Sequence, residues 1–266
     1  MAHVAASDPL FSVQDQVVLV SGASRGIGHA IARGFAERGA QVTITGRQSQ
    51  TIEQAAKEIS GKSVPVEARV CDVANGDAIR DTVDSVIKQF GRIDTLVNVA
   101  GINQRKPAVE YSDEEYDQIV GVNLRGIFLM SQAVGKQMLQ QRAGSQINIG
   151  SLNSQRPLTN LLPYAVSKAG VDHMTRALAS EWGQAGVRVN TLAPGFVETD
   201  LTKKVWADET MESWRIANTP QQRIGTPDDM IGTAVFLASD ASVYLTGQVI
   251  YVDGGATAGR MWPFTT

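Results

Sequence analysis

The chain has 266 residues and a formal net charge of −3, from 24 Lys and Arg against 27 Asp and Glu, and 43% of its residues are hydrophobic. This composition excludes a disordered chain and a nucleic-acid-binding basic surface, and no apolar run approaches the roughly 18 residues of a membrane span. The single cysteine, Cys71, excludes an intramolecular disulfide and favours a reducing compartment, so we expect a cytoplasmic protein without nucleic-acid or membrane partners.

Residues 1–14 lack the basic start and apolar run of a signal peptide, and we expect them to form a loosely held N-terminal arm. Short apolar runs then alternate with helical patterns over residues 15–266, which are expected to form a single domain. Strands are predicted at 16–20, 41–45, 64–70, 95–98, 146–149, 187–192 and 248–252. Helices are predicted at 27–38, 51–60, 75–90, 113–141, 164–184 and 227–238.

This alternation is typical of βαβ units. It predicts the α/β class: a doubly wound, Rossmann-type domain with a mostly or wholly parallel sheet of about seven strands and helices on both faces. Ligands of such sheets bind beyond the carboxyl ends of the strands.

A glycine-rich turn follows the first predicted strand. Gly22, Gly26 and Gly28 have the spacing G-x-x-x-G-x-G and stand directly before a helix. Such a turn lets the backbone approach a pyrophosphate, and the helix N-terminus offers unpaired N–H groups. The turn predicts a dinucleotide site, and a turn that serves only helix–strand packing is the alternative.

Tyr164 and Lys168 stand four residues apart at the start of a predicted helix, so both side chains can reach one cleft. An ammonium about 4 Å from the phenol would lower its pKa from about 10 by up to about 3, into the range of efficient acid–base catalysis. Ser151 lies just beyond the fifth strand and can donate a hydrogen bond to a substrate oxygen. A chance Tyr–Lys pair and a loop serine are the alternatives.

Together these motifs resemble the short-chain dehydrogenase/reductase family, from about Gln16 to Gly255. The segment Asn98-Val99-Ala100-Gly101 resembles the family's Asn-Asn-Ala-Gly motif, with Val99 in place of the second Asn. The resemblance implies that Lys168 also binds the nicotinamide ribose and that Asn123 holds a water in a proton relay to Lys168. The implied catalytic set is Asn123, Ser151, Tyr164 and Lys168. The implied cofactor contacts are Gly22, Ser24, Arg25, Gly26, Ile27, Gly28, Arg47, Asp72, Val73, Asn98, Ala100, Gly101, Tyr164, Lys168, Pro194, Gly195, Val197 and Thr199.

The second strand leads into Gly46 and Arg47, where an enzyme that uses NAD usually places a carboxylate. Arg47 can pair with a 2′-phosphate in a fork geometry, and Arg25 in the glycine turn is a second cation. We therefore expect NADP(H) as cofactor, against the alternative of two solvated arginines. Neither His3, His29, His173 nor Cys71 shows metal-ligand spacing, so no metal is expected.

The resemblance implies the interconversion of a secondary alcohol and a ketone. Within the family, the motifs at 103–107 and 218–220, with Arg223 and Gly225, are most similar to sugar-acid and polyol dehydrogenases of the gluconate 5-dehydrogenase kind. The alternatives are a 3-oxoacyl or general ketone reductase and, from another class, a catalytically silent NADP-binding regulatory module.

The predicted substrate site includes Arg105, Ser151, Asn153 and Tyr164. Arg105, or second to it Lys106, is expected to bind a substrate carboxylate, with Asn153, Gln155 and Arg156 serving sugar hydroxyls. If the loop cations are only solvated, a neutral polyol or an apolar ketone is the alternative substrate.

A lid is expected over 196–219, with Trp206, Met211 and Trp214 as its large apolar residues. For one or both tryptophans, packing at a subunit interface is the alternative. The resemblance implies a homotetramer. We expect the tail of Trp262 and Phe264 to lie in an interface or near a neighbouring active site, against the alternative of a tail folded on its own subunit.

Overall fold

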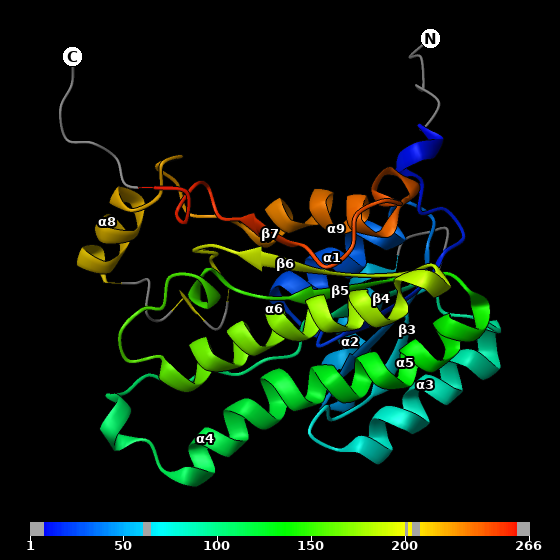
Figure 1. The fold of residues 1–266 in the computed structure, drawn as a ribbon, viewed down its shortest axis with the longest axis horizontal. Coiled ribbons are helices and arrows are strands. Elements are labelled where there is room, and N and C mark those ends of the chain that lie inside the picture. The colour runs from blue at the N-terminus through cyan, green and yellow to red at the C-terminus, as the bar shows by residue number, and fades with distance from the viewer. Residues whose placement is uncertain (1–7, 61–64, 200–201, 204–207, 260–266) are drawn as a thin grey trace.

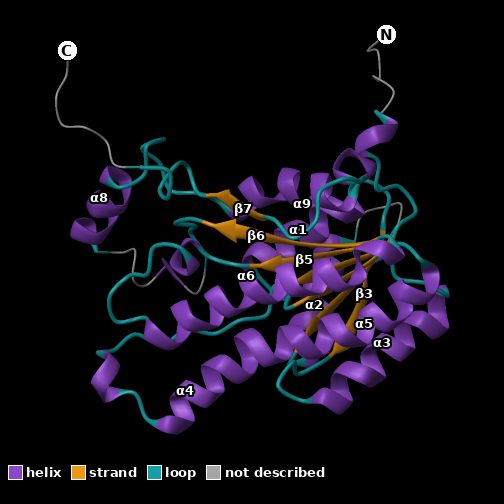
Figure 2. Ribbon diagram, in the orientation of Figure 1, coloured by secondary structure: helices purple, strands orange, loops and turns teal. Residues whose placement is uncertain are grey.

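A seven-stranded sheet forms the middle of the molecule, and helices cover both of its faces (Figures 1 and 2). This computed structural model describes residues 8–60, 65–199, 202–203 and 208–259. The strand order is β3-β2-β1-β4-β5-β6-β7, and every pairing is parallel. The predicted fold class is confirmed.

The strands follow the predicted apolar runs closely. They are β1 Val17–Ser21, β2 Gln41–Gly46, β3 Glu67–Val70, β4 Thr95–Asn98, β5 Gly144–Ile149, β6 Val187–Pro194 and β7 Val249–Val252. The third strand begins three residues later than predicted, after Pro65, whose ring cannot donate to a strand ladder.

The helices are α1 Gly26–Ala36, α2 Ser49–Ile59, α3 Gly76–Phe90, α4 Asp113–Val120, α5 Ile127–Gln141, α6 Leu162–Trp182, α8 Glu209–Ala217 and α9 Ile231–Ala238. Two of them differ from prediction. A π-helical turn, Gly121–Gly126, separates α4 from α5 within the predicted helix 113–141. α8 lies in the expected lid, where no helix was predicted, and begins where Asp208 caps the Met211 N–H at 3.0 Å.

Alternate side chains of each central strand enter opposite cores. In β1, Val18 and Val20 join the core beneath α1, α2 and α9, whereas Val17 and Leu19 join the core beneath α3, α5 and α6. Both sets are buried, which is why β1 is apolar without interruption. None of the helices in the described ranges is long and apolar enough to cross a membrane.

The strand order reverses between β1 and β4. From β1 the chain proceeds to β2 and β3 on one side, and it then returns to β4 on the other. Ser21 at the end of β1 therefore pairs with Asn98 at the end of β4. A ligand site is expected beyond these two strand ends.

The N-terminal arm is partly attached to the domain. Val13 is buried in the core, and the ring of Phe11 lies 6.5 Å from that of Phe236 in α9. Residues 1–7 lie outside the described residues. The attached part of the arm therefore packs on the outer side of α9.

Candidate active site

The glycine turn after β1 packs directly on the chain after β4. The carbonyl of Ser21 accepts hydrogen bonds from Val99 N at 2.9 Å and Ala100 N at 3.0 Å. Gly22 has a φ of +82°, and a Cβ on it would lie 2.5 Å from Ala100 N. Only glycine fits such a contact, which brings the two predicted cofactor motifs together.

The N-terminus of α1 is open to an anion. Its N-cap residue, Arg25, makes no side-chain capping hydrogen bond, and the first turn holds no acidic residue. A Cβ on Gly28 would lie 2.4 Å from Gly22 O, so the turn is packed as tightly as glycine allows. These uncapped N–H groups and this bare backbone fit a dinucleotide pyrophosphate.

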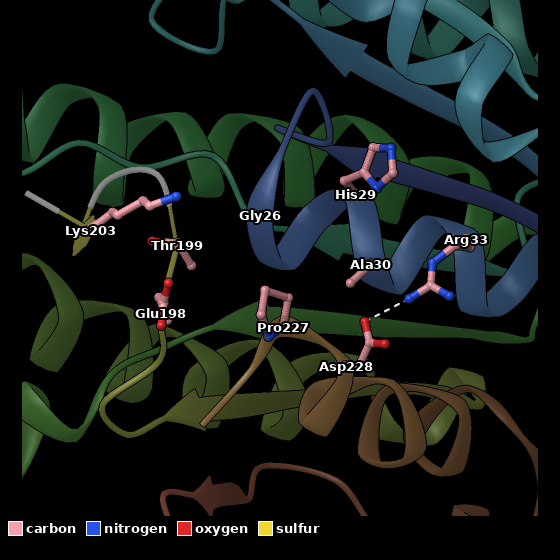
Figure 3. Close-up of a pocket in the computed structure, with 9 residues that line it drawn as sticks. All are labelled: Gly26, His29, Ala30, Arg33, Glu198, Thr199, Lys203, Pro227 and Asp228. Carbon is pink, nitrogen blue, oxygen red and sulfur yellow. Dashed lines mark hydrogen bonds and ion pairs between the residues drawn. The ribbon is translucent and has the colours of Figure 1, made fainter. Parts of the chain in front are cut away.

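A pocket of about 320 Å³ lies along α1 beside this turn (Figure 3). It is lined by Gly26, His29, Ala30, Arg33, Glu198, Thr199, Lys203, Pro227 and Asp228. Thr199 approaches Gly26 so closely that a Cβ on Gly26 would lie 3.6 Å from the threonine Cβ and Cγ2. Arg33 bridges to Asp228 at 2.6 Å and ties α1 to the turn before α9. The segment after β6 thus begins next to the glycine turn.

The ends of β2 and β3 present the predicted selectivity residues. Gly46 is buried, and its carbonyl accepts a hydrogen bond from Cys71 N at 2.9 Å. Arg47 and Asp72 follow these two strand ends, and both are exposed. Neither Gly46 nor Arg47 brings a carboxylate to the end of β2, so the site fits a phosphorylated ribose.

Asn123 sits in the π-helical turn and is fully buried. Its Oδ1 accepts from Ile102 N at 2.8 Å, and its Nδ2 donates to Ile102 O at 2.9 Å and to Ser167 Oγ at 3.2 Å. A Cβ on Gly101 would lie 3.4 Å from Asn123 Oδ1 and 3.8 Å from Lys168 Nζ. Asn123 therefore fixes the chain after β4 beside Lys168, and its water relay stays a prediction.

Lys168 is 3% exposed and donates from Nζ to Ile149 O at 2.7 Å. Its Nζ lies 5.7 Å from the centroid of the half-buried Tyr164 ring. Burial lowers the pKa of Lys168 to about 8, and the nearby carboxylate of Asp172 acts in the opposite direction. The ammonium is therefore the main form at neutral pH.

The predicted lowering of the Tyr164 pKa by Lys168 is wrong for the protein alone. Burial raises the pKa of Tyr164, and a hydrogen bond with Ser151 opposes that effect. Desolvation disfavours the phenolate more strongly than the neighbouring groups stabilise it.

Ser151 caps the short turn Leu152–Ser154. Its Oγ accepts from Asn153 N at 3.1 Å and from Asn153 Nδ2 at 3.4 Å. Asn153 Oδ1 in turn accepts from Leu158 N at 2.9 Å. The amide of Asn153 thus shapes the loop that carries Ser151.

The two predicted loop cations have different surroundings. Lys106 forms an ion pair with Glu115 of α4, and its Nζ lies 5.3 Å from the ring centroid of Tyr111. The Lys106 hydrogen bond is the main cause that lowers the pKa of Glu115 to about 2. Arg105 is exposed beyond β4, whereas Arg156 donates to Ala256 O at 3.0 Å. The assignment of Arg105 to a substrate carboxylate stays a prediction.

Helix α8, in the segment predicted to form a lid, packs on a small apolar cluster. The rings of Phe196 and Trp214 meet edge to face with centroids 5.7 Å apart, and Trp214 is 42% exposed. Leu152, next to Ser151, packs with Phe196 and Ala256. This cluster connects the loop of Ser151 to α8. Trp206 lies outside the described residues, as do Trp262 and Phe264 of the tail.

One buried residue beside the site was not predicted. Asp172 lies one helical turn after Lys168 and is 5% exposed. Its spacing of four from Lys168 was visible in the sequence, but its burial depends on packing against the ends of β5 and β6. Among the residues described, no group of three or more His, Cys, Asp or Glu could hold a metal.

Comparisons with known proteins agree with this geometry. A family model described as "Enoyl-(Acyl carrier protein) reductase" matches residues 22–257. The chain is 37% identical to gluconate 5-dehydrogenase of Gluconobacter oxydans, over 93% of this chain and 97% of that protein. It is 38% identical to a 3-oxoacyl-[acyl-carrier-protein] reductase of Thermotoga maritima, over 91% and 98%. The crystal structure of a gluconate 5-dehydrogenase from Burkholderia cenocepacia in complex with NADP and tartrate superposes with a TM-score of 0.91 at 35% identity, covering 94% of this chain and 98% of that one.

Proposed function

The chain belongs to the short-chain dehydrogenase/reductase family and is an NAD(P)-dependent oxidoreductase, and on that premise we propose that it interconverts a secondary alcohol and a ketone on a sugar acid with NADP(H). The observation that carries this proposal is the convergence of Ser151, Tyr164 and Lys168 beside the carboxyl ends of β4 and β5. The glycine turn after β1 adjoins the same place.

The proposed cofactor residues divide into three groups. Gly22, Gly26 and the α1 N-terminus would hold the pyrophosphate, and Arg25 and Arg47 the 2′-phosphate. Ser24, Ile27, Gly28, Asp72, Val73, Asn98, Ala100, Gly101, Pro194, Gly195, Val197 and Thr199 complete the proposed contacts. The bound cofactor supplies the hydride acceptor and donor.

The protein's own residues move the proton. Tyr164 takes the hydroxyl proton of an alcohol at its Oη, or returns it to a ketone oxygen. Lys168, held by Ile149 O, places a positive charge beside the ring and stabilises the phenolate. Ser151 hydrogen-bonds the reacting oxygen, on which negative charge develops. Asn123 holds the backbone after β4 in place beside Lys168 through its hydrogen bonds with Ile102.

The sugar-acid substrate is supported by the relatives that act on gluconate and by Arg105 at the open edge of the site. A guanidinium binds a carboxylate through two parallel hydrogen bonds, which fixes both position and orientation. Closure of residues 196–219, including α8, over the cleft would exclude water. Gluconate and 5-ketogluconate are the proposed pair.

A 3-oxoacyl reductase is the second candidate, because the chain is as similar to the Thermotoga maritima reductase as to the gluconate enzyme. The catalytically silent module is disfavoured by the buried Lys168 and by the Ser151–Tyr164 hydrogen bond, which a binding protein would not need.

A substrate panel tests the proposal. Gluconate, neutral polyols and simple secondary alcohols are assayed with NADP⁺, and 5-ketogluconate and 3-oxoacyl thioesters with NADPH. We expect the gluconate pair to have the highest kcat/KM. A higher kcat/KM for the thioesters would select the second candidate instead.

We also propose a cytoplasmic homotetramer. The cytoplasm is supported by a lone, buried cysteine, and assembly by apolar side chains exposed on neighbouring helices. These are Tyr116, Phe128, Leu162 and Val166 on α4, α5 and α6. Light scattering at micromolar concentration should give four times the chain mass, and a monomer mass would refute the assembly.

A further inference from the structure

Asp172 is a buried carboxylate aligned with the catalytic pair. α6 carries Tyr164, Lys168 and Asp172 at successive intervals of four residues, so their side chains follow one face of the helix. Asp172 is 5% exposed, and its Oδ1 is buried with no hydrogen-bond partner in the part of the chain that the structure describes. Burying a carboxylate oxygen in this way is costly unless a positive charge lies nearby.

The carboxylate lies at the strand end that holds the catalytic groups. A Cβ on Gly150 would lie 3.1 Å from Asp172 Oδ1, so the missing side chain makes room for the carboxylate. Gly150 stands between Ile149, whose carbonyl accepts from Lys168, and Ser151. Asp172 therefore packs against the one residue that separates the anchor of Lys168 from the catalytic serine.

Each element packed around this carboxyl presents a different group. On α6 the charged neighbours are Lys168 and Arg176, of which Arg176 is exposed. β6 and the Leu152–Ser154 turn present the hydroxyls of Thr191 and Ser154, whose hydrogen bonds with the Asp172 carboxyl oppose the rise that burial causes in its pKa. Tyr251 Oη of β7 lies 3.4 Å from Ser154 Oγ. Arg176 and Lys168 thus both place positive charge near Asp172, and of the two only Lys168 is buried.

We propose that Asp172 is a positioning residue, which keeps the Lys168 ammonium charged and directed at Ile149 O beside Tyr164. The inference rests on the proposed role of Lys168 in the reaction. Burial alone pushes Lys168 toward its neutral form, and the Asp172 charge opposes that effect. Without that charge, the pKa of Lys168 would be lower still. As the pH rises, the ammonium that stabilises the Tyr164 phenolate would then lose its proton sooner than in the wild type.

The test follows the titration of Lys168 by NMR on isotopically labelled lysine, with its signal assigned by its loss in Lys168→Met. Asp172→Asn keeps the shape of the side chain and removes the charge. We expect the Lys168 midpoint to fall by one pH unit or more, a tenfold loss of proton affinity. Arg176→Gln, which removes the exposed cation from the same helix, is the matched control and should leave the midpoint within about 0.3 of its value.

A second readout is kinetic. At pH 9, a fall of one unit from a Lys168 pKa of about 8 lowers the ammonium fraction about tenfold, so kcat for alcohol oxidation should fall about tenfold in Asp172→Asn, while KM stays within about threefold. The double variant Lys168→Met/Asp172→Asn should have a kcat within twofold of that of Lys168→Met alone, because the carboxylate acts through the lysine. An equal loss of kcat in both backgrounds would contradict the proposal.

The NMR result needs no substrate, so it stands whether or not gluconate is oxidised. An unchanged Lys168 midpoint in Asp172→Asn overturns the inference. If Asp172→Asn does not fold, the pH titration of the Lys168 signal in the wild type tests the proposal instead. Its Lys168 signal should show a second, smaller inflection above pH 3.8, where Asp172 takes up its proton, because burial raises the pKa of that carboxyl. A single inflection would overturn the proposal.

Discussion

The cofactor side and the substrate side of the active site are built in different ways. On the cofactor side, backbone does most of the shaping: Gly22 and Gly28 allow contacts that a Cβ would prevent, and α1 presents uncapped N–H groups. On the proposed substrate side, contacts of side chains set the shape, as where Lys106 pairs with Glu115 of α4 and Arg156 donates to the carbonyl of the distant Ala256. The backbone of the cofactor side therefore suits one cofactor shape. The shape of the substrate side can be altered by single substitutions.

Gly22→Ala should have the largest effect on the cofactor side. The alanine must adopt a φ of +82° and would press its Cβ onto Ala100 N. We expect NADPH to bind at least about 100-fold more weakly, measured by nicotinamide fluorescence.

Gly91→Ala is the matched control. Gly91 has a φ of +76° but meets nothing within 4 Å, so it shares the backbone strain without the contact. It should cost about 1 kcal/mol of stability and leave NADPH affinity unchanged. Equal losses of affinity in the two variants would show that the contact with Ala100 does not shape the site.

Arg47→Asp tests the selectivity of the same side. The change replaces an exposed guanidinium by a carboxylate that accepts from a ribose hydroxyl and repels a 2′-phosphate. The ratio of kcat/KM for NADP⁺ to that for NAD⁺ should fall by about 10- to 100-fold. A wild type that prefers NAD⁺, or a ratio that does not move, would refute the role of Arg47.

Arg105→Ala tests the substrate side. Losing a charge-assisted hydrogen bond of about 2 kcal/mol should lower kcat/KM for gluconate about 30-fold and leave a neutral polyol unaffected. Arg80→Ala, an exposed arginine on α3, is the control for loss of surface charge. If Arg105→Ala lowers kcat/KM for gluconate and for the neutral polyol equally, the arginine does not recognise a carboxylate.

The depressed pKa of Lys168 should have a smaller effect, on how the free energy of unfolding depends on pH. Its pKa is about 8 in the folded protein and about 10.4 in an unfolded chain. Between these values the unfolded state binds more protons, so the free energy of unfolding rises with pH in that window. We expect a rise of about 1–2 kcal/mol in the wild type relative to Lys168→Met, measured by denaturant unfolding. Parallel pH curves would contradict the depressed pKa.

The difference between local backbone features and contacts between side chains also explains which parts of the structure the sequence could predict. All seven strands were predicted, most of them because they are rich in apolar or β-branched residues and bounded by turns. The glycine turn was recognised because its residues are contiguous. The π-helical turn at Asn123 was missed because the helical periodicity of 113–141 continues through it. α8 was missed because its polar sequence gives only the Asp208 cap as a signal.

Long-range packing accounts for the rest. Lys106 lies in the loop after β4 and its partner Glu115 lies nine residues later on α4, and nothing in the sequence identifies Glu115 as that partner. The direction of the Tyr164 pKa was wrong because a spacing of four residues gives the distance to Lys168 but not the burial of the hydroxyl. Burial is a property of the folded site, and there its effect on the Tyr164 pKa outweighs that of the hydrogen bond with Ser151.

The most direct test of the account compares gluconate-dependent reduction of NADP⁺ by the wild type and by Tyr164→Phe. Both proteins should bind NADPH equally, because the change removes one hydroxyl and keeps the ring. The account predicts that kcat falls by about 10²- to 10⁴-fold in Tyr164→Phe, because the proton acceptor is lost. A variant that binds NADPH normally and keeps the wild-type kcat would contradict it.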